Sequence, residues 1–408
     1  MKTSNSIKII VILTIFFSLA ASRPAAADPN DWVIIQLTNN SYDDLYPKID
    51  GQNVVWHGSD GNDFEIFLYN IDSNTTTQLT NNSYDDTNPL VSGSNVIWLG
   101  YNGPDATTEI YFYDGNSVTR LTNDAFTDGI QQISGSYAAW SSAEQTGQFT
   151  WVYSLVVYDG NDTRRIIDYV DPARAVNSSI SGPNVVYLGT DGLDTELYIH
   201  NIDANTITPL TSNNYSDASA SIDGSCITWA GRGGTIGSDW EILFYDGTTT
   251  TQITDNDYED SAPVVSGKNM LWRGKDGGSG SDYDLFFYKG TVPIKLTVNE
   301  YNDNGSISGD NVVWSSYDGV DNEIFFYEGG NITQLTDNST DDAYPKISGK
   351  NIVWRVHDGN DDEIFLAVPR CYPKPVADLN GDCKVTLKDL AILFSEWLNC
   401  NLYPKTGC

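Results

Sequence analysis

The stretch QLTNNSYDDLYPKIDGQNVVWHGSDGNDFEIFLYN, residues 36–70, decides the fold, because variants of it follow one another from Gln36 to Val368. Each copy contains a run such as NVVW, and the aromatic residue that ends this run marks the place of the copy. The eight markers are Trp56, Trp98, Trp140, Tyr187, Trp229, Trp272, Trp314 and Trp354. They are spaced 40 to 47 residues apart. A period of about 40–45 residues containing several short strands is typical of a β-propeller, in which each repeat forms one blade.

Each copy carries four strand-like segments. The first ends at ISG or IDG, the second is NVVW or a variant, the third resembles EIFLY, and the fourth resembles TTTQLT. They are rich in β-branched and aromatic residues and are bounded by Gly, Asn and Asp turns. The last copy lacks a fourth strand, whereas WVIIQLT, residues 32–38, precedes the first complete copy. We therefore expect an all-β fold: an eight-bladed β-propeller of four-stranded blades of about 42 residues, closed by the N-terminal strand.

The first 27 residues have the pattern of a secretory signal peptide. Lys2 and Lys8 precede the apolar run IIVILTIFFSLA, and three alanines at 25–27 supply small residues for cleavage. This run is too short to suit a transmembrane anchor, and no other segment could span a bilayer. We expect residues 1–27 to be removed, residues 28–369 to form the propeller and residues 370–408 a C-terminal module. The predicted location is secreted or extracellular, with the periplasm and the cell surface as alternatives and no membrane insertion.

The charge of the chain restricts its partners. Lys and Arg number 22 against 55 Asp and Glu, which gives a formal net charge of -33. Nucleic acid and anionic lipid are therefore poor partners. Divalent cations, basic surfaces and neutral glycans remain open.

Two loops of each blade are acidic: the connection from the fourth strand to the next blade, and the loop between the second and third strands. In the first two units they carry Asp44, Asp86, Asp60 and Asp63. Propeller topology places both loops on one face. A carboxylate also opens the third strand in seven of the eight copies, namely Glu65, Glu109, Glu196, Glu241, Asp284, Glu323 and Glu363. These acids either accept loop hydrogen bonds and fix the blade spacing, or in part bind Ca²⁺, which prefers oxygen ligands.

The aromatic residues divide into two groups. The marker tryptophans lie in strands with apolar residues on both sides, so we expect them in the core. Tyrosines near the acidic face are the better candidates for sugar contacts; they are Tyr42, Tyr84, Tyr215, Tyr258 and Tyr301. The predicted binding residues on this face are Asp44, Asp86, Asp60, Asp63, Tyr42, Tyr84 and Tyr258.

An Asp-x-x-Pro element precedes the inner strand in four units: Asp44 to Pro47, Asp86 to Pro89, Asp260 to Pro263 and Asp342 to Pro345. In this element the repeats resemble the TolB-like (WD40-like) propeller family. The other four units lack it. The resemblance implies the propeller fold over most of the mature chain and leaves function open, because members of that family serve as binding platforms and as accessory domains of enzymes.

The C-terminal segment DLNGDCKVTLKD, residues 378–389, has the ligand spacing of an EF-hand calcium loop. Side-chain oxygens would come from Asp378, Asn380, Asp382, Thr386 and Asp389, and the backbone carbonyl from Lys384. The following LAILFSEWL places apolar residues on one side of an expected helix. Position 6 of the loop is Cys383, where the pattern has Gly.

Loop and helix together resemble one repeat of a type I dockerin, a module that binds Ca²⁺ and docks onto cohesins in cellulose-degrading assemblies. A full dockerin has two such repeats, whereas this tail has one. The resemblance implies a Ca²⁺ cofactor and a cohesin-like or cell-surface protein partner. Four cysteines of the tail, Cys371, Cys383, Cys400 and Cys408, are expected to form two disulfides, with three connectivities open. Cys226 is expected to be a buried hydrophobic residue.

No catalytic motif is present. The three histidines, His57, His200 and His357, lack a nearby nucleophile pattern, and the abundant acids recur in nearly every unit, whereas catalytic residues should be singular. The favoured function is an exported, monomeric binding scaffold with a calcium-dependent docking module, binding a glycan or a protein on its acidic face. The alternatives are a carbohydrate-active enzyme, a hydrolase or lyase acting on polysaccharide, and a structural cell-surface protein.

Overall fold

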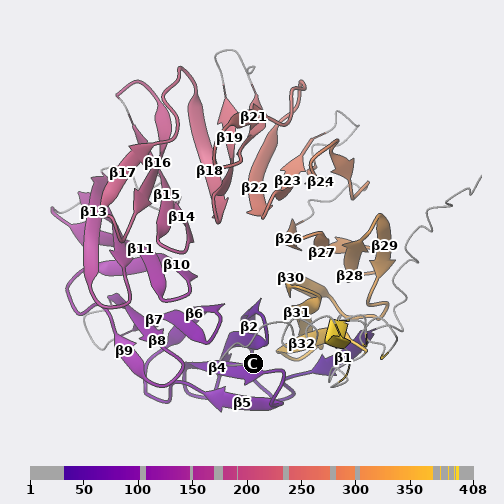
Figure 1. Cartoon of the computed structure of the whole chain (residues 1–408). Coiled ribbons are helices and arrows are strands. Elements are labelled where there is room, and N and C mark those ends of the chain that lie inside the picture. The colour runs from indigo at the N-terminus through magenta and orange to yellow at the C-terminus, as the bar shows by residue number, and fades with distance from the viewer. Residues whose placement is uncertain are drawn as a thin grey trace, which may run out of the picture.

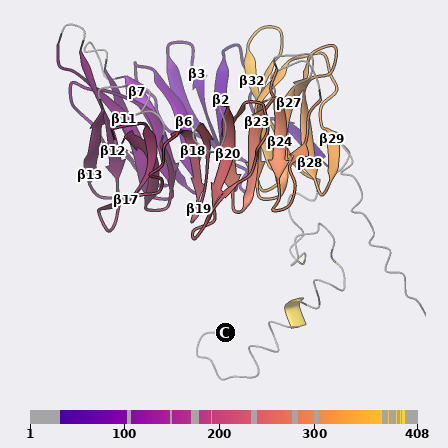
Figure 2. The same cartoon turned by 90° about the horizontal axis from the view of Figure 1, so that it is seen from above.

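The structure is a computed structural model of the chain. It describes residues 32–101, 107–147, 150–169, 178–190, 192–232, 239–275, 282–298 and 304–370, together with 377, 385, 390 and 392–394. The described strands form eight sheets arranged in a ring, with the first strand of each repeat innermost (Figure 1). Seen from the side, the ring is a disc with loops on its two faces (Figure 2). The predicted eight-bladed propeller is confirmed.

Every blade is a four-stranded antiparallel sheet, and blades are numbered here by the order of their inner strands. Blade 1 holds β2 (Asp44–Asp50), β3 (Asn53–Ser59), β4 (Phe64–Asn70) and β5 (Thr75–Gln78). Blade 2 holds β6 (Asp86–Ser92), β7 (Asn95–Tyr101), β8 (Thr108–Tyr113) and β9 (Val118–Arg120). Blade 3 holds β10 (Thr127–Ser134), β11 (Tyr137–Gln145), β12 (Trp151–Tyr158) and β13 (Thr163–Tyr169). Blade 4 holds β14 (Ser178–Ser181), β15 (Asn184–Thr190), β16 (Thr195–Asn201) and β17 (Thr206–Pro209).

The second half repeats this arrangement. Blade 5 holds β18 (Ser216–Asp223), β19 (Cys226–Arg232), β20 (Trp240–Tyr245) and β21 (Thr250–Gln252). Blade 6 holds β22 (Asp260–Ser266), β23 (Asn269–Gly274), β24 (Asp284–Tyr288) and β25 (Ile294–Lys295). Blade 7 holds β26 (Asn304–Ser308), β27 (Asn311–Tyr317), β28 (Asn322–Glu328) and β29 (Asn331–Gln334). Blade 8 holds β30 (Asp342–Ser348), β31 (Asn351–His357), β32 (Asp362–Pro369) and, as its outer strand, β1 (Trp32–Gln36).

The ring closes through the N-terminal strand, as predicted. β1 pairs antiparallel with β32 from Trp32 opposite Pro369 to Gln36 opposite Phe365. Beyond the strand, Ile364 N donates to Thr38 Oγ1 at 2.9 Å. Pairing the two chain ends in one blade leaves β32 without an open edge.

The core lies between neighbouring blades, because the second and third strands are apolar on both faces. Val54 packs toward blade 8 with Trp56, whereas Val55 packs toward blade 2 with Trp98. All seven marker tryptophans and Tyr187 are buried, so the prediction that they form core is confirmed. Cys226 is also buried, in the cluster with Trp272.

The face opposite the acidic loops is held by a ring of hydrogen bonds between blades. In most blades the Ser of the ISG turn accepts a bond from the turn glycine of the next blade, as Ser348 Oγ does from Gly51 N at 2.9 Å. The Asn that opens a second strand donates to the carbonyl of the next turn glycine, as Asn53 Nδ2 does to Gly93 O at 2.7 Å. The repeated ISG-x-N pattern is therefore a joint between neighbouring blades.

The Asp-x-x-Pro element is a β-bulge in the inner strand. In blade 1 the pairing register shifts between Leu45 and Lys48, which leaves Tyr46 and Pro47 outside the ladder. Tyr46 has a φ of 54°, a conformation uncommon for a non-glycine residue. The equivalent residues Asn88, Ser219, Ala262 and Tyr344 share this positive φ.

The predicted signal peptide and the predicted calcium ligands and disulfides of the tail lie outside the described residues. Of the tail, Leu390 and residues 392–394 are helical, but no helical C-terminal module is seen in the described part of the chain. Within that part, no helix has the length and apolar character that crossing a bilayer requires.

Candidate functional site

The two acidic loops meet on one face in four blades whose connecting residues the structure describes, as propeller topology predicts. Ser59 N, at the end of the second strand, donates to Asp43 O before the first strand at 3.1 Å. The same bond joins Tyr101 to Asp85, Lys275 to Glu259 and His357 to Asp341. We call this side of the ring the loop face.

The second Asp of the YDD-type loops is buried beneath the loop face wherever the structure describes it. Asp44 is 3% exposed, and its Oδ1 accepts a hydrogen bond from Trp56 Nε1 at 2.8 Å. Asp86 accepts the same bond from Trp98 at 3.0 Å. Asp217, Asp260 and Asp342 repeat it with Trp229, Trp272 and Trp354. A buried indole N–H needs an acceptor, and this carboxylate provides it.

This geometry corrects the placement of Asp44 and Asp86. The sequence predicted both as binding residues of this face and left open that such acids fix the blade spacing. The structure supports the second role, because both are buried supports of their blades. Burial raises the pKa of Asp44 to about 6, and it raises the pKa of Asp86 to about 6 as well, against the hydrogen bonds that stabilise the ionised form.

The glutamate that opens the third strand is buried as well. Glu65 is 0% exposed, and its Oε1 accepts a hydrogen bond from Asn82 N in the next blade's loop at 2.6 Å. Asn40 N makes the same bond to Glu363, and Asn338 N to Glu323. The second oxygen of each, Oε2, is buried and has no hydrogen-bond partner. An unpaired buried carboxylate oxygen is costly, which points to a missing ligand.

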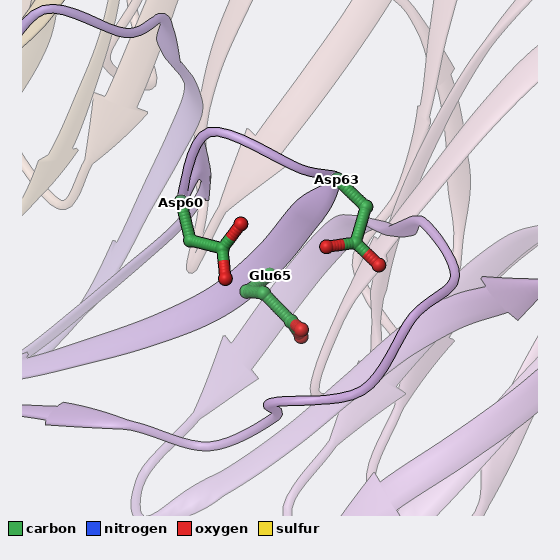
Figure 3. Close-up of side chains that lie close together, drawn as sticks. All are labelled: Asp60, Asp63 and Glu65. Atoms are coloured by element: carbon green, nitrogen blue, oxygen red, sulfur yellow. The ribbon is translucent and has the colours of Figure 1, made fainter.

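Two aspartates of the second-to-third-strand loop complete a cluster with this glutamate. In blade 1, one carboxylate oxygen from each of Asp60, Asp63 and Glu65 lies within 4.8 Å of the others. The three side chains point toward one another beneath the loop (Figure 3). Asp60 Oδ1 also caps the turn by accepting from Asn62 N at 2.9 Å, whereas both oxygens of Asp63 are buried without a partner.

The same three-carboxylate cluster occurs twice more in the described residues, in blades 7 and 8. It consists of Asp318, Asp321 and Glu323 in blade 7, and of Asp358, Asp361 and Glu363 in blade 8. Blades 7, 8 and 1 are consecutive around the ring (Figure 1). The three clusters therefore lie along one arc of the loop face.

A carboxylate from the next blade stands beside each cluster. Asp85, in the loop that leads into blade 2, accepts a hydrogen bond through its Oδ1 from Phe64 N at 3.0 Å. Phe64 lies between Asp63 and Glu65 in the sequence. Asp341 accepts the equivalent hydrogen bond from Asn322 N, and Asp43 accepts it from Asp362 N. The first Asp of the YDD pattern thus joins neighbouring blades.

Burial and mutual repulsion both disfavour ionisation in the clusters. The pKa of Asp63 is raised by burial and then by the charges of Asp60 and Asp85. The pKa of Asp361 is raised by burial and by Asp358 and Asp43. Carboxylates arranged in this way lack a positive partner among the described residues of the cluster, and a bound cation would supply it.

The site differs from the sequence prediction in one residue type. Asp60 and Asp63 belong to a cluster, as the calcium hypothesis requires, and Glu65 belongs to it as well, although the sequence prediction did not list Glu65 among the binding residues of this face. The signal was present in the spacing Asp60-Gly-x-Asp63-x-Glu65. A period of two places Glu65 on the same side of the extended chain as Asp63.

Three of the predicted tyrosines lie exposed on the loop face, whereas Tyr215 is half-buried and packs against the core cluster that contains Trp229. Tyr42, Tyr84 and Tyr258 are each more than two-fifths exposed. Each donates its backbone N–H to the Asn two residues before it, which fixes the loop. Tyr258 also lines a cavity of about 340 Å³ together with Trp272, Phe286 and Pro293. Tyr301 lies outside the described residues.

The histidines form no catalytic arrangement within the described residues. His57 is buried and accepts a hydrogen bond from Asn88 N at 3.2 Å, and burial lowers its pKa to about 4. His357 lies 3.3 Å from Asp362. Neither contacts a Ser or Cys nucleophile in the bonds that the structure describes.

None of the protein-family models matches the chain, and no curated protein sequence is significantly similar to it. Solved structures do match. An acylaminoacyl peptidase of Pyrococcus horikoshii aligns with a TM-score of 0.52 at 13% identity over 78% of this chain and 58% of the peptidase. A puromycin-hydrolyzing peptidase of Mycobacterium tuberculosis aligns with a TM-score of 0.51 at 12% identity, over 78% of this chain and 59% of the peptidase. The dipeptidyl peptidase 4 of Porphyromonas gingivalis aligns with a TM-score of 0.50 at 11% identity, over 76% of this chain and 57% of the peptidase. The chain thus spans less than three-fifths of these enzymes, and the likeness shows a shared propeller fold.

Proposed function

We propose that this chain is an exported, calcium-binding β-propeller that serves as a binding scaffold. The observation that carries the proposal is the recurring cluster of two aspartates and a glutamate, in which buried carboxylate oxygens lack a hydrogen-bond partner. A repeated site of this kind supports a scaffold role better than catalysis, because a catalytic pair would be expected once in the ring.

Calcium fits the donor set better than other common cations. All donors are carboxylate oxygens, which excludes a preference for soft metals. Ca²⁺ accepts six to eight oxygen ligands in flexible geometry, whereas Mg²⁺ retains several waters and is seldom held by an all-protein cage. Backbone carbonyls of the Asp60–Asp63 loop would add to the three carboxylates.

The cation would act between blades. Glu65 is already bonded to the loop of blade 2 through Asn82, and Asp85 of that loop stands beside Asp63. In blade 8 the same bonds join Glu363 to Asn40 and Asp43 to Asp362, so this site spans the two ends of the propeller chain. Calcium would stiffen the loop face on which Tyr42, Tyr84 and Tyr258 are displayed, and a glycan or protein partner is proposed to bind there.

The remaining elements of the proposal come from the sequence. The TolB-like resemblance supports a binding platform, and the leader-like pattern of residues 1–27 supports export. The dockerin-like tail, with Asp378, Asn380, Asp382, Lys384, Thr386 and Asp389 as calcium ligands, supports attachment to a cohesin-like or cell-surface protein. An association with polysaccharide degradation follows from the same resemblance.

Calorimetric titration of chelator-treated, full-length protein with calcium tests the proposal. We expect several sites, of which Asp60→Asn with Asp63→Asn removes one and Asp382→Ala removes another. Asp257→Asn, an exposed aspartate on the same face, is the matched control and should leave the number of sites unchanged. An unchanged number of sites in the Asp60/Asp63 variant would reject the propeller site. Release of reducing ends from a polysaccharide by the wild-type protein would replace the scaffold proposal with an enzyme.

A further inference from the structure

Comparing equivalent positions of the blades helps to separate functional residues from structural ones. Where one blade carries a residue that other blades lack, the propeller fold does not require that residue. At the bulge of the inner strand, blades 1 and 8 both read Tyr-Pro-Lys: Tyr46 to Lys48 and Tyr344 to Lys346. Equivalent positions in blade 6 are Ala262 and Val264, and blade 2 has Leu90 at the lysine position. The two unusual copies are neighbours in the ring, since β2 and β30 lie side by side (Figure 1).

Lys48 and Lys346 have no ion-pair partner within the part of the chain that the structure describes, although the chain is rich in acids. Lys48 and Lys346 are half-buried, and neither makes a salt bridge with a described residue. Burial lowers the pKa of Lys48 to about 8, and the charge of Lys346 adds to that effect. Burial likewise lowers the pKa of Lys346. Two neighbouring ammonium groups without a counter-ion among the described residues indicate a site for an anionic group that comes from outside the chain.

Tyr46 and Tyr344, two residues before the lysines in their strands, form an aromatic platform. Tyr46 is 51% and Tyr344 is 60% exposed, and their ring centroids are 6.5 Å apart. Tyr46 is backed by the ring of His57 at 5.3 Å, and Tyr344 by the Arg355 guanidinium at 4.9 Å. The protein thus contacts one face of each tyrosine ring, and the opposite face of the ring is left available to a flat ligand.

A cavity adjoins the platform between blades 7 and 8. Its volume is about 360 Å³, within the roughly 300–1,000 Å³ usual for small-molecule sites. Lys346, Tyr344, Arg355, Asn304, Ser315 and Tyr317 contribute to its lining. Asp341 also lines it, and Arg355 Nη1 donates to Asp362 at 3.1 Å. Arg355 is thus already paired, and Lys346 is the cationic side chain of the lining that makes no salt bridge with a described residue.

We propose that this site binds an anionic saccharide, with the acid group beside Lys48 and Lys346 and the sugar ring on Tyr46 and Tyr344. Asn304, Ser315 and Tyr317 would contact the sugar hydroxyls. Lysine supplies charge-assisted hydrogen bonds to a carboxylate, and aromatic rings supply flat apolar area. This inference stands on different residues from the calcium clusters and does not depend on them.

Binding of three probes to full-length protein tests the proposal: a uronic acid trisaccharide, its methyl ester, and inorganic sulfate. The acid trisaccharide should bind at least about tenfold more tightly than the ester, which lacks the charge, and than sulfate, which lacks the sugar ring. Equal binding of the ester would overturn the role of the lysines. Equal binding of sulfate would reduce the site to a simple anion site and overturn the saccharide.

Substitutions borrowed from other blades keep the fold while removing the site. Lys48→Leu with Lys346→Val should weaken acid trisaccharide binding about tenfold or more, and Tyr344→Ala should weaken it several-fold. Lys268→Met with Lys350→Met removes the same charge from turns on the opposite face and should change nothing. Retained affinity in the first variant would overturn the proposal. Thermal unfolding and calcium titration of each variant separate loss of the site from loss of the fold.

Discussion

At the residue scale, aspartate has two roles in this protein, and the hydrogen-bond donors around each aspartate decide which role it has. Asp86 is buried against Trp98 and holds an indole N–H, whereas Asp63, also largely covered, has no donor to satisfy it. The two differ in hydrogen bonding rather than in type. A carboxylate with donors is stabilised in its ionised form by the protein itself, whereas one without donors is stabilised by protonation or by a bound cation.

Neutralising Asp63 should therefore have opposite effects with and without calcium. In metal-free protein, Asp63→Asn removes an unpaired buried charge and should raise the melting temperature by a few degrees. In excess calcium the same change should lower it relative to wild type, because a ligand is lost. Thermal unfolding in chelator and in calcium measures both effects. A melting temperature lowered equally in both conditions would mean that Asp63 is purely structural.

Removing the acceptor of a tryptophan should destabilise the blade whether or not calcium is present. Asp86→Ala leaves the Trp98 N–H buried and unpaired, at a cost of about 1–3 kcal/mol. Asp86→Asn, which retains an acceptor oxygen, should cost less. Urea unfolding monitored by tryptophan fluorescence measures the difference. Equal stability of the Ala and Asn variants would show that the hydrogen bond contributes nothing measurable.

At the element scale, ring closure is the special joint of this fold. Seven blades are built from contiguous sequence, whereas blade 8 joins β1 to β32 across the whole chain. The opposite face closes with Ser348 and Gly51, and the loop face closes with Glu363 and Asn40. Closing a loop of this length carries an entropic cost that these contacts and the strand pairing must offset.

Calcium should protect the closing strand from exchange. Hydrogen exchange of β1 should slow several-fold on adding calcium, because the blade 8 cluster is bonded to the segment that follows β1. Asp361→Asn should abolish this effect, whereas Asp321→Asn, which removes the equivalent ligand from blade 7, should leave it. Exchange in β1 that is independent of calcium, in protein that binds calcium, would contradict the proposed closing role.

At the scale of the whole molecule, many carboxylates are more easily protonated in the folded state than in the unfolded state. Burial raises the pKa to about 6 or 7 in six of them: Asp44, Asp86, Asp128, Asp217, Glu241 and Asp260. The folded state then binds more protons than the unfolded chain between about pH 4 and pH 7. Two buried histidines, His57 and His200, act in the opposite direction because burial lowers their pKa.

The free energy of unfolding of the metal-free protein should therefore fall as the pH rises from about 4 to 7, since the six carboxylates outnumber the two histidines. Calcium should make this fall smaller, because it favours the ionised form of the clusters. Urea unfolding at several pH values, in chelator and in calcium, measures both slopes. A stability that rises over this range in chelator would contradict the raised carboxyl pKa values.

The sequence by itself determined the propeller, its eight blades and its closure, because a repeat of one pattern leaves a single way to bury strands that are apolar on both faces. It also predicted the core tryptophans, and it identified which loops share a face. Only the tertiary structure separated Asp44 and Asp86 from Asp60 and Asp63, because all four look alike in an acidic loop. Asp44 and Asp86 accept hydrogen bonds from tryptophans 12 positions away, and the strand that follows Asp60 and Asp63 is bonded through Phe64 N to Asp85 in the loop leading into the next blade. For the same reason, the neighbouring positions of Lys48 and Lys346 followed from ring closure, which brings together residues from opposite ends of the propeller.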